Sequence, residues 1–319
     1  MDSLYDRLKK ESVRIGISDL GMVPVSDSDS FLDYLQWLKS GRQAGMVYLE
    51  RNLEARKNPF GVFPAAKTLI IGLLSIQDLA EKTDLSPYQE KALSGKRKGR
   101  IIPYGVLPDY HSVLRSKLNE LYSFLRKDFP DISGRVVVDT APIPEKEWAY
   151  RAGLGRPGRN SLLIHPALGS TFFIGILLVS LEYEAFRKEE ETLPPVQKDP
   201  CSNCDLCKRA CPVGAIGSDR KLDARRCLNY WTIENKKDPL PGFVQKNLGN
   251  RLFGCDECIR ICPYNRAYKE KWDFLGLDLD LLEEMSGKEF QERFGSLPLV
   301  RPGLDQLRNI SRIIGDFRR

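Results

Sequence analysis

Eight cysteines carry the clearest chemical signal in the sequence, and all of them lie between residues 201 and 262. The first four follow the pattern Cys-x2-Cys-x2-Cys-x3-Cys-Pro. In bacterial ferredoxins this spacing wraps three thiolates around one four-iron cluster and sends the fourth thiolate to a second cluster. A later group reads Cys-x2-Cys-x3-Cys-Pro, and one more cysteine stands upstream of it. Eight thiolates match two 4Fe-4S clusters.

The crossed ferredoxin arrangement assigns four cysteines to each cluster. We expect one set to consist of Cys201, Cys204, Cys207 and Cys262, and the other of Cys211, Cys227, Cys255 and Cys258. Zinc and disulfides are the alternatives. Zinc ribbons use paired Cys-x2-Cys knuckles, and disulfides are rare in chains without an export signal. The sequence therefore favours two clusters, which relay single electrons.

The composition predicts a folded protein of about two domains. The chain has 319 residues, of which 42% are hydrophobic and 29% are charged, as in ordinary globular proteins. Its net charge of +6 permits a polyanionic partner without requiring one. The first residues lack an apolar signal-peptide core, and the most apolar stretch, residues 171–181, is too short to span a bilayer. We therefore expect a cytoplasmic protein with no membrane partner.

Hydrophobic spacing predicts the elements that must position a redox site. Helices are expected near residues 4–13, 31–38 and 110–129, and buried strands over residues 67–74, 135–139 and 171–181. This alternation predicts an α/β domain over residues 1–197, which ends in a charged, proline-bearing stretch. A ferredoxin-like two-cluster module is predicted over residues 198–270, and a short helical tail over residues 271–319. No dinucleotide-binding or P-loop glycine motif occurs.

Several segments of the chain resemble the epoxyqueuosine reductases. They read WLKSGRQAGMVYLER at residues 37–51, PYGVLPDYH at 103–111, VVDTAPIPEKEWAYRAGLGRPGRNSLLIHPALGSTFFIG at 137–175, and GNRLFGCDECIRICP at 249–263, together with the first cysteine run. The resemblance covers nearly all of residues 30–270. It implies an enzyme with cobalamin, bound in the α/β domain, and two 4Fe-4S clusters. Such enzymes reduce the epoxide of epoxyqueuosine at the tRNA wobble position, which completes queuosine.

The chain departs from this family pattern in two places. It reads GLGRPGRN at residues 153–160, where family members usually read GLGWxGKN, so an aromatic residue is replaced by Arg156. Longer family members also append helical HEAT-like repeats, whereas this sequence stops some fifty residues after Cys262. Part of the RNA contact is therefore expected to be missing or differently built.

The resemblance makes Asp139 the proton donor to the epoxide oxygen. Asp139 follows an apolar strand, at the sheet edge where α/β proteins place ligands. We expect partial desolvation to raise its pKa enough to hold a proton near neutral pH. From the pattern alone, an aspartate before such a turn is also typical of a capping residue.

The resemblance further implies base-off cobalamin, with no protein imidazole below the cobalt. Large amphipathic rings bind between small residues, apolar walls and a few polar anchors. The predicted contacts are Gly158, Asn160, Leu163 and Ile174, with Arg56, Tyr104, Asp139 and Thr232 added by family position. Leu163 and Ile174 fit equally well as ordinary core residues. We interpret His111 and His165 as locally hydrogen-bonded histidines.

A basic run predicts contact with the tRNA phosphates. Lys96, Arg97, Lys98 and Arg100 stand between and beside two glycines, in what reads as a loop. Arg156, Arg159 and Arg251 would extend this track, although a charge run is also typical of a solvated loop. The expected partners are the tRNA and an external low-potential electron donor, and we expect a monomer.

Two other functions fit parts of the pattern. A reductive dehalogenase shares the cobalamin and two-cluster plan, but such enzymes usually carry a twin-arginine leader, which is absent from the start of this sequence. A noncatalytic two-cluster electron carrier would explain the cysteines. It would leave Asp139 and the basic run unexplained.

Overall fold

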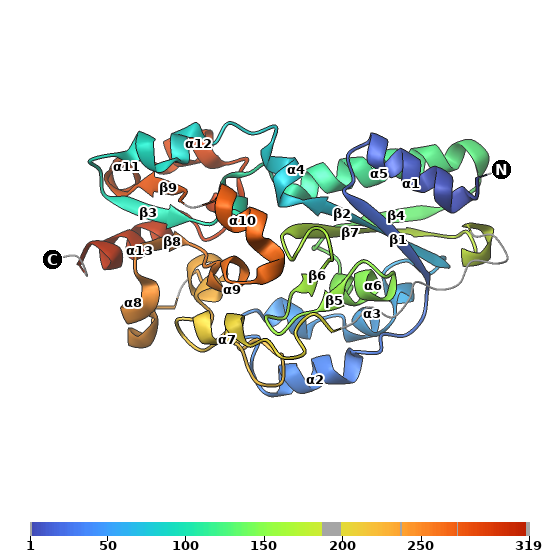
Figure 1. Cartoon of the computed structure of the whole chain (residues 1–319), viewed down its shortest axis with the longest axis horizontal. Helices are drawn as coiled ribbons and strands as arrows, with labels where there is room; N and C mark the ends of the chain where they lie inside the picture. The colour runs from blue at the N-terminus through green and yellow to red at the C-terminus, as the bar shows by residue number, and fades with distance from the viewer. Residues whose placement is uncertain (1, 187–198, 237, 273, 317–319) are drawn as a thin grey trace.

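The largest sheet of the protein has four antiparallel strands in the order β1-β2-β7-β4. The computed structural model describes residues 2–186, 199–236, 238–272 and 274–316. The strands are β1 (Asp19–Pro24), β2 (Thr68–Ser75), β7 (Phe172–Val179) and β4 (Gly134–Val137). In Figure 1 this sheet lies on the right, in the half of the molecule that holds the N-terminus.

Helices cover both faces of this sheet. Helices α1 (Leu4–Arg14) and α5 (Tyr110–Asp128) lie on one face, and α6 (Glu145–Arg151) lies on the other (Figure 1). Alternate residues of β2 therefore enter different cores: Ile70 packs in the core that contains α5, and Ile71 in the core that contains α6. Because both faces are covered, all eight residues of β2 are buried, which explains its continuous apolar sequence.

The long helix α5 packs closely on β7. Leu114, Leu118, Leu121 and Leu125 are fully buried along one side of the helix. A Cβ atom on Gly175 of β7 would come within 2.7 Å of the Leu118 side chain. The absence of a side chain at this position therefore sets the helix-to-sheet distance. The first turn of α5 lies at the edge where β7 begins, since the Tyr110 ring stacks on Phe173.

A second sheet joins segments that are far apart in the sequence. Its strands are β8 (Arg251–Phe253), β3 (Lys98–Ile101) and β9 (Gly276–Asp278), in that order. The central strand β3 pairs in parallel with β8 and antiparallel with β9. The three ranges proposed as domains, 1–197, 198–270 and 271–319, thus each supply one strand. Their boundaries stay a prediction.

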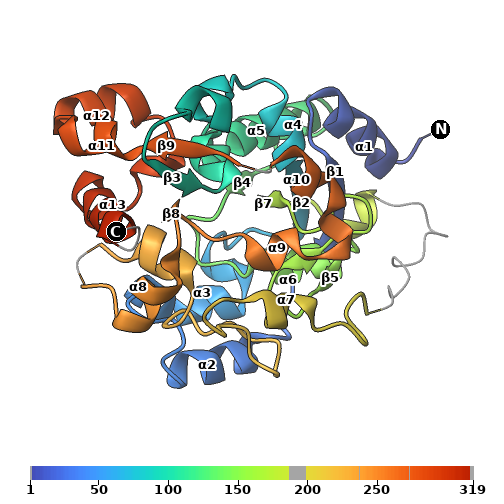
Figure 2. The ribbon, with the colours of Figure 1, turned by 60° about the vertical axis from the view of Figure 1, so that its left-hand side comes forward.

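The remaining helices surround the second sheet and the cysteines. Near the C-terminus lie α11 (Leu279–Glu284), α12 (Gly287–Phe294) and α13 (Leu304–Asp316), which Figure 2 shows at the left beside β9 and β3. The cysteine region contains α7 (Leu206–Ala210), the π-helix η7 (Tyr230–Glu234), α8 (Gly242–Leu248), α9 (Glu257–Arg260) and α10 (Arg266–Lys271). Helices α7 and α9 pack against each other. Two further helices, α2 (Phe31–Lys39) and α3 (Leu53–Lys57), come from the N-terminal part.

The element predictions are largely confirmed, with two corrections. The expected helices and strands correspond to α1, α2, α5, β2, β4 and β7, in a mixed α/β fold. We expected Asp139 to lie at a sheet edge where the carboxyl ends of the strands meet. That expectation is wrong, because neighbouring strands of the main sheet are antiparallel. The basic run is not a single loop, because Lys98 and Arg100 belong to strand β3. Most of the predicted domain joint, residues 187–198, lies outside the described residues, as does the end of the predicted helical tail, residues 317–319.

In the described parts of the chain, no helix combines the length and the apolar character that crossing a bilayer requires.

Candidate active site

The carboxylate of Asp139 lies at the centre of a hydrogen-bonded network just beyond β4. The Tyr110 hydroxyl donates to Oδ2 of Asp139 over 2.9 Å, and Nε2 of His111 lies 3.3 Å from the same oxygen. On the other side of the ring, Nδ1 of His111 lies 2.7 Å from Oδ1 of Asp109. The backbone N–H of Asp139 donates to Oε1 of Glu145 over 2.7 Å. Three side chains, those of Tyr110, His111 and Glu145, thus converge on one loop residue.

Local structure explains how these residues meet. Asp109 caps α5 by accepting a hydrogen bond from the backbone N–H of His111, so the first turn of the helix presents Tyr110 and His111 together. The Tyr110 ring stacks between Phe173 and His111, with ring centroids 3.9 and 4.0 Å away. Asp139 has a positive φ of 56°, a conformation that aspartate tolerates better than most residues.

The network lowers the pKa of Asp139. The hydrogen bond from His111 is the main cause, and the hydrogen bond from Tyr110 acts in the same direction against partial desolvation. The expectation of a raised pKa is therefore wrong for this conformation, because two donors stabilise the carboxylate. The same contacts raise the pKa of His111, with Asp139 as the main cause and Asp109 as a further one. The network thus favours a proton on the histidine and a charge on Asp139.

The first turn of α6 adds two titratable groups. Burial, as the main cause, and the neighbouring Asp139 carboxylate together raise the pKa of Glu145 to about 8. Desolvation lowers the pKa of Lys146, whose Nζ donates to the carbonyl of Ser161 over 2.7 Å. At neutral pH we therefore expect Glu145 to be protonated. Like charges so close to each other do not ionise together easily.

The side chains around Asp139 line a concave surface. Tyr48 exposes 46% of its area to solvent, and the side chain of Asp139 exposes 49%. Surrounding protein nevertheless desolvates both, and this burial raises the pKa of Tyr48 to about 12. A side chain that is both open to solvent and enclosed by protein lies in a hollow. Aromatic rings and charged groups therefore share one accessible surface.

Several residues of this surface were not predicted from the sequence. Arg301 forms an ion pair with Glu234 over 2.8 Å, and its charge acts on both Tyr104 and Asp139. Tyr48 and Glu145 were also missed. Arg301 and Glu234 come from distant segments, and no sequence pattern indicates that they belong to this site. Tyr110 and His111 lie inside the PYGVLPDYH segment, which could have pointed to them.

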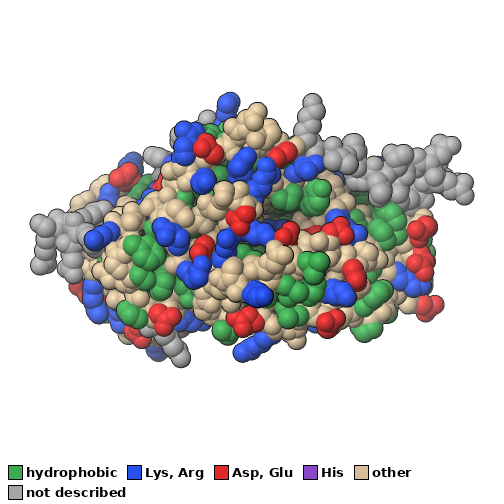
Figure 3. All heavy atoms as spheres, turned by 90° about the horizontal axis from the view of Figure 1, so that it is seen from below, with side chains coloured by type: hydrophobic (Ala, Val, Ile, Leu, Met, Phe, Trp, Pro, Cys, Tyr) green, Lys and Arg blue, Asp and Glu red, His purple; other side chains and the backbone are tan. Residues whose placement is uncertain are grey.

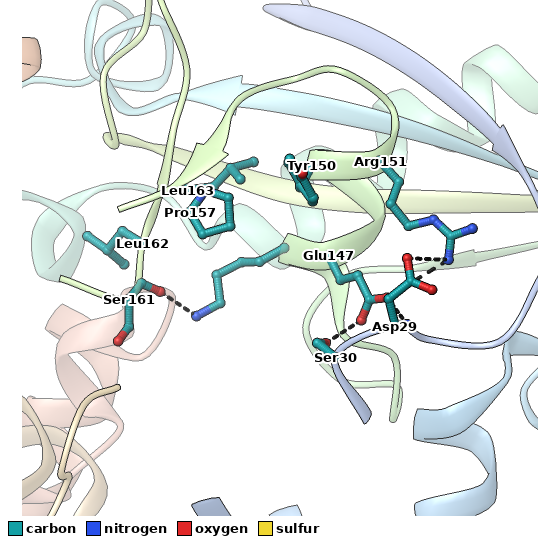
Figure 4. Close-up of a pocket in the computed structure, with 10 residues that line it drawn as sticks. Asp29, Ser30, Glu147, Tyr150, Arg151, Pro157, Ser161, Leu162 and Leu163 are labelled. Carbon is teal, nitrogen blue, oxygen red and sulfur yellow. Dashed lines mark hydrogen bonds and ion pairs between the residues drawn. The ribbon is translucent and has the colours of Figure 1, made fainter. Parts of the chain in front are cut away.

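A cavity of about 310 Å³ opens beside α6. Figure 4 shows its wall, which includes Tyr150 from α6, Pro157 from β5 (Arg156–Pro157) and the predicted contact Leu163 from β6 (Leu163–Ile164). Lys146 lines this cavity and also interacts electrostatically with Asp139. The cavity alone is at the lower end of the usual range for small-molecule sites. Its lining of aromatic, aliphatic and charged groups is of the kind that a large amphipathic ring contacts.

The other predicted cobalamin contacts occupy different surroundings. Asn160 is buried, and its Nδ2 donates to the carbonyl of Cys258 over 3.5 Å, which ties this loop to the cysteine region. The N–H of Gly158 donates to the carbonyl of Leu162. Ile174 is half-buried against the core that contains α6. Their contact with a corrin stays a prediction.

Three predicted contacts come from short helices: Tyr104 from η5 (Pro103–Val106), Arg56 from α3 and Thr232 from η7. Tyr104 packs on Phe173 and Phe253, with ring centroids 6.4 and 5.5 Å away. Arg56 donates to the carbonyl of Tyr48 and therefore reaches the edge of the hollow. Thr232 is fully buried; its hydroxyl donates to Leu228 and accepts from Gly254. Its side chain thus offers a ligand no accessible surface, so the predicted contact of Thr232 is not supported.

The cysteine thiols interact in two groups. Burial is the main cause that raises the pKa of Cys207, and the thiols of Cys201, Cys204 and Cys262 raise it further. Burial also raises the pKa of Cys258 well above its usual value. Smaller effects in the same direction come, in decreasing order, from the thiols of Cys255, Cys227, Cys211 and Cys207. Apart from Cys207, the thiols that act on each of these two cysteines belong to its own proposed set. The assignment of each cysteine to a cluster stays a prediction. All eight cysteines are free of disulfides.

Eight free cysteines provide the number of thiolates that two four-iron clusters need. Among the described residues, no three His, Cys, Asp or Glu side chains converge closely enough to hold one metal ion. In a four-iron cluster each thiolate binds a different iron, so its four ligands lie farther apart than ligands of one ion. Bound iron would also keep these thiols deprotonated despite their burial.

The basic residues proposed as phosphate contacts all have partners within the chain. Lys96, Arg97 and Lys98 pair with Asp278, Asp280 and Glu90, at 3.0, 2.8 and 3.1 Å. Arg100 pairs with Asp256 and Arg251 with Glu257, and both arginine side chains are only 17% exposed. Arg159 donates to the carbonyl of Cys201, and Arg156 lies over the Tyr150 ring. Figure 3 shows basic side chains scattered among acidic ones on one face.

Comparison with known proteins identifies relatives of both parts of the chain. Residues 200–265 match the family model of a 4Fe-4S double cluster binding domain, and residues 56–140 match the model described as epoxyqueuosine reductase QueG, DUF1730. The epoxyqueuosine reductase of Cyclobacterium marinum is 31% identical to this protein over 92% of this chain and 91% of its own length.

Solved structures agree with this assignment. An epoxyqueuosine reductase in complex with a tRNA-Tyr epoxyqueuosine-modified stem loop matches 98% of this chain and 80% of its own, with 27% identity and a TM-score of 0.82. The epoxyqueuosine reductase of Bacillus subtilis, with its aspartate-bearing catalytic loop swung out of the active site, matches with 26% identity, the same coverage and a TM-score of 0.82. On these grounds the chain belongs to the epoxyqueuosine reductase family.

Proposed function

We propose that this protein reduces the epoxide of epoxyqueuosine in tRNA to the alkene of queuosine. The observation that carries the proposal is the position of Asp139. In a chain of this family, its carboxylate is exposed in an aromatic hollow, and two donors from α5 hold it there. The Bacillus subtilis relative also carries a catalytic aspartate on a loop.

The reaction needs electrons and protons in equal number. Conversion of the epoxide to an alkene releases the oxygen as water and consumes two electrons and two protons. When bound, two 4Fe-4S clusters would be held by the two cysteine sets and would pass single electrons from an external low-potential donor. Cobalamin, when bound, would supply the reducing cobalt chemistry that cleavage of the epoxide requires.

The residues of this chain then have distinct tasks. Asp139 delivers a proton to the departing oxygen, and Tyr110 and His111 hold its carboxylate in place. Leu163, Ile174, Tyr104, Gly158 and Asn160 are the proposed contacts of the corrin.

The proposed substrate surface is narrower than the basic residues of the sequence suggest. Arg100 and Arg251 are largely buried in ion pairs with Asp256 and Glu257, so we do not include them. Lys96, Arg97, Arg156 and Arg159 remain the proposed phosphate contacts, and Lys98 lies at the edge of this group. A relative of this chain binds a tRNA stem loop. We propose that the enzyme acts as a cytoplasmic monomer.

The test is reduction of the modified nucleoside itself. The protein, with iron–sulfur clusters and cobalamin restored, is incubated with a reductant and an epoxyqueuosine-bearing tRNA stem loop, and the nucleosides are then identified by mass. We expect queuosine to replace epoxyqueuosine. An unchanged epoxide in protein that has bound both cofactors would reject the proposal, and protein that takes up iron but no corrinoid would favour an electron carrier.

A further inference from the structure

The network at Asp139 contains a proton carrier that the proposed reaction does not yet use. We propose that His111, held by Asp109, is the residue that supplies protons to Asp139 during turnover. This inference rests on the proposed function. His111 acts through Asp139 and does not itself contact the substrate, so it is a positioning and supply residue.

The geometry of the ring supports this role. Both ring nitrogens of His111 face carboxylate oxygens, Asp109 at 2.7 Å and Asp139 at 3.3 Å. Carboxylates can only accept hydrogen bonds, so both ring nitrogens must carry a proton to satisfy both contacts. The doubly protonated ring is therefore the form that the site holds. The side chain is 23% exposed, which allows the ring to take up a proton from solvent.

Other charged groups nearby also affect which residue of this network holds a proton. Besides Asp109 on its own helix, the charged or titratable groups that act on this network include Glu145 and Lys146 from α6 and Arg301 from the C-terminal part. Arg301 adds to the forces that lower the pKa of Asp139. A carboxylate with a lowered pKa holds few protons at neutral pH and needs a neighbour to supply them.

The proton path can be written with each atom placed. When negative charge develops on the epoxide oxygen, the N–H at Nε2 of His111 gives its proton to Oδ2 of Asp139. Asp139 delivers a proton to the epoxide oxygen and becomes a carboxylate again. The histidine then recovers a proton from water, while Asp109 remains a carboxylate throughout. Each turnover uses this path for protons only, because the two electrons come from the external donor through the clusters.

The first test is the pH dependence of epoxyqueuosine reduction by the cofactor-loaded enzyme. We expect the wild-type rate to decline as the pH rises through the titration of His111. In H111Q the rate at neutral pH should fall at least ~10-fold, and the decline should begin at lower pH. In D109N the low-pH rate should be retained while the decline moves to lower pH, because the imidazolium loses its charged partner.

A purely structural role gives a different result. Loss of packing or of a hydrogen bond would scale the rate equally at every pH and leave the position of the decline unchanged. That outcome in both H111Q and D109N would overturn the proposal. His165 is the matched control, since it is the other histidine of the chain and also binds a carboxylate, Asp19, at 3.0 Å. H165Q should leave the position of the decline where it is in the wild type.

A second readout does not depend on turnover. The two histidines of the cofactor-loaded enzyme can be titrated by nuclear magnetic resonance, with H165Q used to assign the signals. D139N should lower the pKa of His111. An unshifted His111 would contradict the pairing. If the wild-type enzyme did not reduce epoxyqueuosine, the proposed function would fail, and this titration would still decide whether His111 and Asp139 are coupled.

Discussion

At the scale of single residues, the groups around Asp139 differ in how firmly they hold a proton. The pKa of Asp139 is lowered and that of His111 is raised, while burial raises the pKa of Glu145 to about 8. Groups with separated pKa values in one small space are typical of acid–base sites. The family resemblance pointed to Asp139 from the sequence. The direction of its pKa shift depends on Tyr110 and His111, which are 28 or more residues away along the chain. The sequence does not show that these side chains contact Asp139 in the folded protein.

Glu145 provides a prediction about stability. A carboxyl with a raised pKa keeps a proton in the folded protein that it loses on unfolding, so between about pH 5 and 8 it makes stability fall as the pH rises. Glu145→Gln mimics the protonated form and should reduce this fall by up to about 1.4 kcal/mol per pH unit. Urea unfolding of wild type and variant at several pH values measures the difference. Parallel pH dependences would show that Glu145 is ionised in the folded protein.

At the scale of elements, the site depends on how α5 is seated on the main sheet. The helix brings Tyr110 and His111 to the edge where β7 begins, and its four buried leucines fix its height above the strands. Periodicity was sufficient to predict this helix and the buried strand β2. It could not predict the antiparallel order of the sheet or the pairing of β3 with β8 and β9, because such pairings leave no local pattern in the sequence.

The contact between α5 and β7 gives a second prediction. Gly175→Ala places a Cβ within 2.7 Å of Leu118 and 3.0 Å of Leu114, so the helix must shift. We expect a loss of about 1–3 kcal/mol in the free energy of unfolding and a lower reaction rate. Gly287→Ala is the control, because a Cβ at Gly287 meets no atom within 4 Å. Equal stability of the two variants in urea unfolding would argue against close packing at this point.

At the scale of the whole molecule, the two sheets and the cysteine region meet around the proposed site. Arg301 and Glu234 reach it from the C-terminal and cysteine parts, and Asn160 ties the cavity loop to Cys258. Local cysteine spacing was enough to predict the double-cluster domain, while the ligands of each cluster stay a prediction. The contributions of Arg301 and Glu234 depend on the assembled fold, so no motif in the sequence could point to them.

The proposed tRNA surface gives a prediction about salt dependence. Replacing Lys96 and Arg97 together by alanine should weaken binding of the tRNA stem loop. It should also reduce the slope of log affinity against log salt by about 0.7–0.9 for each phosphate that the variant no longer neutralises. Binding measured at several salt concentrations tests this. Lys288→Ala, an exposed lysine on α12, is the control. An unchanged slope in the double variant would mean that these residues serve only their ion pairs with Asp278 and Asp280.

The most direct test of the account is the turnover of Asp139→Asn. Asparagine has nearly the same shape but cannot deliver a proton, so the variant should bind iron, corrinoid and tRNA like the wild type. Its rate of queuosine formation, followed by nucleoside mass analysis, should fall by about 100-fold or more. A variant that carries both cofactors and still forms queuosine at the wild-type rate would contradict the central role of Asp139.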